Sequence, residues 1–164
     1  MDRREFIGRT AQAAAFTALS ADRVIGANDR VRVALIGCGG RGRTVARSMR
    51  QAPNAEYTVA CDVYETNANL ASKQLSDGKA AIEKDFRKVL ERKDVDAVHV
   101  ATPDHWHAAI AVLACQAGKD AYVEKPFAYT VREGRAIAEA AARNKRIVMA
   151  GTQHRSSPHI AEAA

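Results

Sequence analysis

An apolar strand, a glycine-rich turn and a helix follow one another early in this chain, and they constrain its fold more than any other feature. Residues 31–36 read VRVALI, a short run rich in branched apolar side chains that is typical of a buried strand. Residues 37–42 read GCGGRG, a GxGxxG pattern, and residues 41–51 have helical character until Pro53 and Asn54. A GxGxxG turn in this context predicts a site for the pyrophosphate of a dinucleotide.

Each glycine of the turn is predicted to have a separate task. Gly37 permits the tight turn, Gly39 lets the backbone approach the phosphates, and Gly42 lets the helix pack against the strand. The free N–H groups of the turn and the dipole of the following helix favour an anion. The same site includes the intervening residues Cys38, Gly40 and Arg41.

Asp62 ends the second predicted strand, twenty residues beyond Gly42. At that place a carboxylate accepts hydrogen bonds from the hydroxyl groups of the adenosine ribose. The same carboxylate repels a 2′-phosphate, so the sequence favours NAD over NADP. Arg41 and Arg43 keep NADP open as an alternative.

Strands and helices are predicted to alternate along the rest of the chain. Further strands are predicted at 56–61, 80–82, 96–101, 121–124 and 147–150, and helices at 65–75, 86–92, 104–117 and 130–144. Asp104 is expected to cap one of these helices, and Thr130 with Glu133 forms a capping box for another. This alternation predicts an α/β fold of the Rossmann type, a doubly wound parallel sheet with right-handed crossovers.

Composition excludes several classes of protein. Apolar residues make up 47% and charged residues 27% of the 164 residues, which excludes a disordered chain. No apolar run is long enough for a membrane span. The net charge is +6, but basic residues alternate with acidic ones and aromatic residues are only 5%, which argues against nucleic-acid binding. Three scattered cysteines predict buried thiols rather than disulfides or a zinc site.

The first thirty residues are predicted to be an export signal. Arg3 and Arg4 precede a Phe-Ile step, which resembles the twin-arginine motif, and residues 10–21 form a short, mildly apolar segment. The competing interpretation is an alanine-rich helix of a cytosolic enzyme. An export signal predicts a periplasmic or otherwise exported protein without a stable membrane anchor.

Three further strand ends carry polar segments. They read TPDHWH at 102–107, EKP at 124–126 and GTQHR at 151–155. Together with the glycine turn, these segments resemble the N-terminal half of the Gfo/Idh/MocA family, over about residues 31–158. That family contains glucose–fructose oxidoreductase, inositol dehydrogenases and many sugar dehydrogenases.

The resemblance implies a role for each strand end. Lys125 would lie between nicotinamide and substrate, bind the reacting hydroxyl and assist proton transfer, with its pKa lowered in a semi-buried site. Glu124 would line the cofactor pocket, and the Lys125–Pro126 peptide bond is expected to be cis. The other residues assigned to the cofactor are Ala101, Thr102, Pro103, His107 and Gln153, and those assigned to the substrate side are His105, Trp106 and Arg155.

The two histidines of the TPDHWH segment have a second possible function. His105 and His107 could form an HxH zinc site, but at i and i+2 on a helix their rings point in different directions, so no metal is predicted. The dipole at the start of a helix disfavours the imidazolium, so both side chains are expected to be neutral.

The resemblance implies an NAD(P)-dependent oxidoreductase that acts on a sugar or polyol. One branch of the superfamily hydrolyses glycosides through transient oxidation by NAD; the EKP lysine is replaced there, so Lys125 favours net dehydrogenase chemistry. A non-catalytic dinucleotide-binding module is the third possibility.

The expected organisation is a signal at 1–30, a dinucleotide-binding domain at 31–155 and, at 156–164, the start of a connection to a missing α+β domain. Without that second domain, which also forms the family's oligomer interfaces, little turnover is expected.

Overall fold

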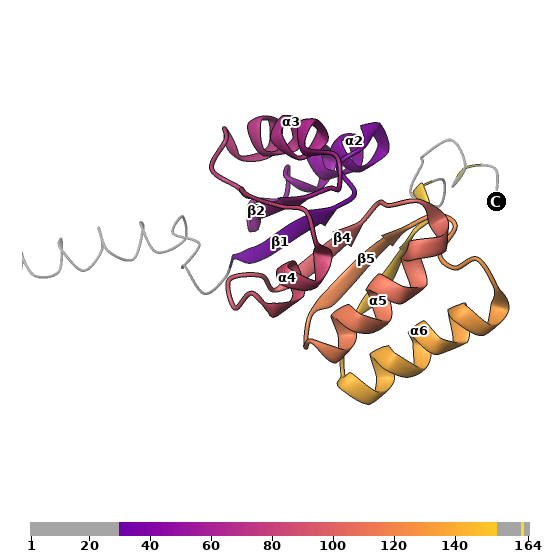
Figure 1. Cartoon of the computed structure of the whole chain (residues 1–164). Coiled ribbons are helices and arrows are strands. Elements are labelled where there is room, and N and C mark those ends of the chain that lie inside the picture. Colours follow the sequence, from indigo (N-terminus) through magenta and orange to yellow (C-terminus); the bar gives the residue numbers. More distant parts are fainter. Residues whose placement is uncertain (1–29, 154–161, 163–164) are drawn as a thin grey trace, which may run out of the picture. The chain divides into compact units, whose positions relative to one another are not determined.

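The computed structural model describes residues 30–153 and residue 162 (Figure 1). Arg3, Arg4 and the rest of the predicted signal up to residue 29 lie outside the described residues, and so does Arg155. The strands are β1 (Val31–Ile36), β2 (Ala55–Cys61), β3 (Ala81–Glu83), β4 (Ala97–Val100), β5 (Asp120–Glu124) and β6 (Val148–Gly151). The helices are α2 (Gly40–Met49), α3 (Glu65–Ser76), α4 (Phe86–Glu91), the 3₁₀ turn η2 (Asp104–Trp106), α5 (His107–Gln116) and α6 (Val131–Asn144).

The strands form one parallel sheet in the order β3-β2-β1-β4-β5-β6. This is the order of the doubly wound dinucleotide-binding fold, so the predicted fold class is confirmed. The strand order reverses between β1 and β4. In open sheets of this kind, ligands bind beyond the carboxyl ends of the strands at such a reversal.

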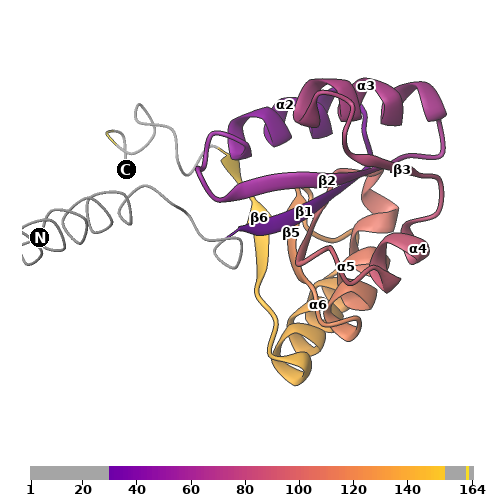
Figure 2. The same ribbon diagram turned by 90° about the vertical axis from the view of Figure 1, so that its left-hand side faces the viewer.

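Helices cover both faces of the sheet. Figure 2 shows α2 and α3 on one face and α4, α5 and α6 on the other. Neighbouring residues of β1 point to opposite faces: Leu35 packs with Tyr57 under α2 and α3, whereas Ala34 and Ile36 pack in the apolar layer that includes residues of α5. Because a buried parallel strand is apolar on both faces, the continuous VRVALI run is explained.

The start of α6 follows its predicted capping signal. Thr130 Oγ1 accepts the N–H of Glu133 at 3.2 Å, and Glu133 Oε2 accepts the N–H of Thr130 at 3.0 Å, so the predicted capping box is present. Gly118, at φ +74°, lies just beyond the end of α5, a position where glycine commonly ends a helix.

The helix predicted at 104–117 differs from the prediction at its start. Asp104–Trp106 form the 3₁₀ turn, and α5 begins only at His107. The Asp104 carboxylate accepts the N–H of the next residue, His105, at 2.9 Å. It therefore does not cap α5, and the prediction of an Asp104 N-cap for this helix was wrong.

His99 is a fully buried imidazole in β4. Its Nδ1 lies 3.2 Å from the Tyr57 hydroxyl, its ring meets the Tyr122 ring edge-on at 5.2 Å, and its Nε2 has no hydrogen-bond partner within the described structure. Burial, with a smaller contribution from the positive charge of Arg41, lowers the pKa of His99 to about 4.

His99 is expected to make the protein less stable in mild acid. Between the folded pKa of about 4 and the unfolded value near 6.5, the unfolded chain binds the proton more tightly, so stability falls as pH falls. Between pH 7 and pH 5 this residue should remove about 2 kcal/mol of unfolding free energy. Urea unfolding at both pH values should show that His99→Phe reduces this loss by about that amount. The exposed control His105→Gln should not, and an unchanged loss in His99→Phe would refute the assignment.

Candidate functional site

The glycine turn has the geometry that a phosphate site requires. Gly37 has φ +91°, and a Cβ there would lie 2.5 Å from the carbonyl group of Ala101. A Cβ on Gly42 would lie 2.2 Å from the Gly37 carbonyl oxygen, so these two glycines let the turn, α2 and β4 pack closely. Gly39 differs, because a Cβ on it meets no atom within 4 Å. Gly39 and the first N–H groups of α2 therefore leave space for an anion.

Asp62 links the end of β2 to the glycine turn. Its Oδ2 accepts the N–H of Cys38 at 2.8 Å, and its Oδ1 accepts the N–H of Tyr64 at 2.8 Å. These two bonds fix the carboxylate beside the turn. Each carboxylate oxygen has a further lone pair, so Asp62 can still accept the hydroxyl groups of a ribose.

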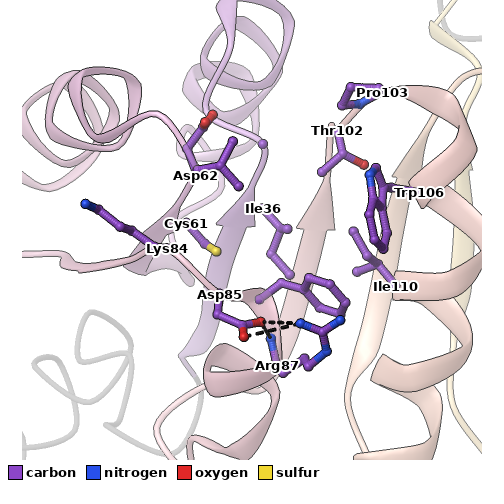
Figure 3. Close-up of a pocket in the computed structure, with 13 residues that line it drawn as sticks. Ile36, Cys61, Asp62, Lys84, Asp85, Arg87, Thr102, Pro103, Trp106 and Ile110 are labelled. Atoms are coloured by element: carbon purple, nitrogen blue, oxygen red, sulfur yellow. Dashed lines mark hydrogen bonds and ion pairs between the residues drawn. The ribbon is translucent and has the colours of Figure 1, made fainter.

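A cavity of about 480 Å³ opens next to Asp62, between the carboxyl ends of β1, β2 and β4 (Figure 3). Trp106 and Phe86 form part of its wall, with ring centroids 6.1 Å apart in an edge-to-face arrangement. The Arg87 guanidinium lies 5.1 Å from the centre of the Phe86 ring and is bonded to Asp85. The cavity thus combines aromatic walls with a carboxylate at its rim.

This cavity includes residues that the sequence analysis did not assign to the site. Lys84, Asp85, Phe86 and Arg87 line it. They follow β3 directly, and the carboxyl end of every strand in a parallel sheet lies at the same edge. The position of these four residues directly after a predicted strand could therefore have identified them from the sequence.

Trp106, which is predicted to lie on the substrate side, lines the cavity that Asp62 also lines, and Figure 3 shows both side chains there. Asp62 is the residue predicted to bind the adenosine ribose. The arrangement therefore favours a position for Trp106 beside the adenosine half of a dinucleotide.

An ion pair joins the glycine turn to the end of β5. Arg41 Nε donates to Glu124 Oε2 at 2.9 Å, and Arg41 Nη2 donates to Oε1 at 3.2 Å. The Glu124 side chain is 3% exposed and that of Arg41 41%. The pair is bidentate, so it holds the end of β5 in a fixed position relative to the turn.

Lys125 and Pro126 follow Glu124 immediately. Their peptide bond is cis, which confirms that prediction. Lys125 is exposed in the described structure, so the semi-buried setting expected for it is not formed by residues 30–153 alone. His107, at the start of α5, contacts the Pro126 carbonyl oxygen at 2.7 Å and the Thr102 carbonyl oxygen at 2.9 Å.

The remaining predicted site residues differ in their burial and contacts. Thr102 Oγ1 is buried without a hydrogen-bond partner, and Pro103 lines the cavity. His105 and Gln153 are exposed. Ala101 packs against Gly37, within the distances given above.

The thiol of Cys38 is directed into the core rather than the site. Its Sγ lies 3.5 Å from the Cys61 carbonyl oxygen, and all three cysteines are buried and free, as predicted. Burial raises the pKa of both Cys38 and Cys61 to about 12, so these thiols stay protonated at neutral pH. Cys38 therefore offers the site only its backbone.

Residues 31–152 match the family described as an oxidoreductase family with an NAD-binding Rossmann fold. The chain belongs to the Gfo/Idh/MocA oxidoreductase family. Its Rossmann domain is thus an NAD(P)-binding domain.

Individual relatives share only part of their length with this chain. A glycosyl hydrolase family 109 protein of Saccharopolyspora erythraea is 37% identical over 114 residues, 65% of this chain and 25% of that protein. An α-N-acetylgalactosaminidase of Shewanella oneidensis is 31% identical over 126 residues, 73% of this chain and 28% of that protein. The crystal structure of GenD2 from gentamicin A biosynthesis, in complex with NAD, has a TM-score of 0.76 at 25% identity, covering 82% of this chain and 38% of that one. The chain thus spans about a quarter of the length of these curated relatives.

Among residues 30–153, no helix is both long and apolar enough to cross a membrane. In the same part of the chain, His, Cys, Asp and Glu side chains do not gather in groups of three or more that could hold a metal ion.

Proposed function

We propose that this protein is the cofactor-binding part of an NAD-dependent oxidoreductase that transfers a hydride between the nicotinamide and a sugar or polyol hydroxyl. The observation that carries the proposal is the position of Lys125. It stands at the carboxyl edge of the sheet, directly after Glu124, which Arg41 bonds to the glycine turn. A primary amine is thereby placed on a segment fixed to the phosphate-binding turn.

The residues present fit a dinucleotide. The open space over Gly39 suits the pyrophosphate, and Asp62 suits the adenosine ribose. The buried, unpartnered Thr102 Oγ1 offers a hydrogen bond near the end of β4.

Two observations support NAD rather than NADP. The Asp62 carboxylate would repel a 2′-phosphate. Arg41 and Arg43, which leave NADP open in the sequence analysis, have other partners, since Arg41 binds Glu124 and Arg43 donates to the Cys38 carbonyl oxygen.

The chemistry divides between the cofactor and this chain. Bound NAD⁺ supplies a hydride acceptor. In its neutral amine form, Lys125 accepts the proton of the reacting hydroxyl, and in the reverse direction its ammonium returns that proton. The Arg41–Glu124 pair keeps Lys125 from moving away from the glycine turn, which favours a productive geometry.

Turnover by the complete gene product tests the proposal. A panel of sugars and polyols is incubated with NAD⁺, and NADH is followed by absorbance. Wild-type protein should form NADH with at least one of them, and Lys125→Met should lower that rate by about a hundredfold or more. If the wild-type protein binds NAD but forms no NADH with any compound of a broad panel, the oxidoreductase proposal is contradicted.

A glycoside hydrolase that uses NAD transiently is the second candidate. The similarity to a glycosyl hydrolase family 109 protein and to an α-N-acetylgalactosaminidase supports it. Release of the coloured group from a chromogenic α-N-acetylgalactosaminide, without net NADH, would favour this candidate over the first.

We also propose that the cavity beside Asp62 receives adenine. Trp106 is the only tryptophan of the chain, so its fluorescence reports this cavity directly. NAD and ADP-ribose should both change the emission, whereas nicotinamide mononucleotide, which lacks adenine, should not. Trp106→Phe removes the signal and serves as the control. Calorimetric NAD binding without any change in emission would place adenine elsewhere.

We further propose, from Arg3 and Arg4, that the protein is exported through the twin-arginine route. Fusion of residues 1–30 to a reporter that is active only after export tests it. Replacement of both arginines by lysine should retain the reporter in the cytoplasm, and continued export would refute the signal.

A further inference from the structure

His107 holds two backbone segments together at the carboxyl edge of the sheet. It is the first residue of α5 and is only 2% exposed. Its Nδ1 lies 2.7 Å from the Pro126 carbonyl oxygen, and its Nε2 lies 2.9 Å from the Thr102 carbonyl oxygen. Both ring nitrogens therefore face an acceptor at hydrogen-bond distance.

The number of donors decides the charge of this ring. A carbonyl oxygen only accepts, and a neutral imidazole has one N–H, so either neutral tautomer would direct a lone pair at one of the carbonyls. Such a contact at 2.7 or 2.9 Å is repulsive, whereas the imidazolium donates to both oxygens. The geometry thus matches the charged ring and neither neutral form.

Two effects oppose the charge. The ring is buried, and the N-terminus of α5 disfavours a cation. Against them stand two charge-assisted hydrogen bonds, each roughly twice as strong as a neutral one. The titratable groups on the segments that hold its partners are Asp104 and His105 in η2, Glu124 at the end of β5 and Lys125 directly after it.

The two carboxylates among these neighbours already have hydrogen-bond partners. Glu124 pairs with Arg41, and Asp104 accepts the N–H of His105. The two backbone carbonyl oxygens are therefore the hydrogen-bond partners of His107.

We propose that His107 is held as an imidazolium and acts as a positioning residue, which fixes Pro126, and with it Lys125, to the end of β4 at Thr102. The proposal rests on the proposed function for the identity of the groups that it positions. It reverses the expectation that His107 is neutral. His107 touches neither hydride donor nor acceptor in this role; it acts through the two backbone segments that it joins.

Nitrogen NMR of the full chain tests the charge of the ring. With ¹⁵N-labelled histidine at neutral pH, His107 should give two protonated ring nitrogens. The signals that disappear in His107→Gln identify the residue. A single protonated nitrogen on His107 would overturn the proposal, and this measurement needs no cofactor.

Cofactor binding tests the positioning role. Glutamine keeps one donor, so His107→Gln should lose one of the two bonds and loosen Pro126. NAD affinity should then fall about tenfold relative to ADP-ribose, which lacks the nicotinamide. A residue that only stabilises the fold would lower both affinities equally, and that result would refute positioning.

Gln116→Ala is the control on the same helix, because Gln116 is exposed and lies at the other end of α5. It should change neither affinity. If wild-type protein binds neither NAD nor ADP-ribose, the proposed function fails, while the NMR result still decides the charge of His107.

Discussion

Replacing Gly39 by valine is expected to abolish NAD binding and to leave the fold intact. Gly39 has φ −63° and ψ −180°, an extended conformation that valine adopts readily, and a Cβ there meets no protein atom within 4 Å. The valine side chain would instead occupy the space over the turn and keep the pyrophosphate from the backbone N–H groups. Loss of two or more charge-assisted hydrogen bonds should weaken NAD binding by at least about a hundredfold.

Calorimetry measures the affinity, and urea unfolding measures the stability. The unfolding free energy of Gly39→Val should stay within about 0.5 kcal/mol of the wild-type value. Gly42→Val provides the contrast, because a Cβ there lies 2.2 Å from the Gly37 carbonyl oxygen and should unfold the protein. Gly134→Ala, on α6, should leave binding unchanged. Wild-type affinity in Gly39→Val would show that the turn does not hold the cofactor.

The elements of this fold were predictable because their signals are local. The strand at 31–36 and the turn at 37–42 form one continuous pattern, and Thr130 and Glu133 are three residues apart. The hydrogen bonds of the capping box connect neighbours in the sequence. The failure at Asp104 is also local: its carboxylate accepts the very next N–H, so the chain makes a 3₁₀ turn before α5 begins.

The site was less predictable because its contacts depend on the order of the strands. Arg41 and Glu124 are 83 residues apart, and they meet only because α2 follows β1 and β1 lies next to β4, which pairs with β5. The placement of Trp106 depends likewise on Phe86, which comes from the segment after β3. The residue types at the strand ends indicated a dinucleotide site, but not which half of the dinucleotide each side chain would face.

The two carbonyl contacts of His107 were unpredictable for the same reason. Its position at the start of a helix suggested a neutral ring, since the helix dipole is a local effect. The two carbonyl oxygens that face the ring come from Thr102 and from Pro126, and the second is nineteen residues away. No pattern within the TPDHWH segment could show that contact.

Removing Arg41 is expected to destabilise the protein more than removing its partner. In Arg41→Met the Glu124 carboxylate, 3% exposed, loses both hydrogen bonds and remains buried, which should cost about 3 kcal/mol of unfolding free energy. In Glu124→Gln the Arg41 guanidinium, 41% exposed, can turn to water, so the loss should be about 1 kcal/mol. The double variant Arg41→Met with Glu124→Met removes both charges and should regain most of the stability lost in Arg41→Met.

Urea unfolding of the two single variants and the double variant forms a mutant cycle that measures this coupling. A double variant at least as unstable as Arg41→Met would mean that packing, and not the uncompensated carboxylate, causes the loss. Equal losses in the two single variants would contradict the difference in exposure on which the expectation depends. Because Lys125 follows Glu124 directly, the same cycle measures how firmly the end of β5, and hence the proposed base, is held to the glycine turn.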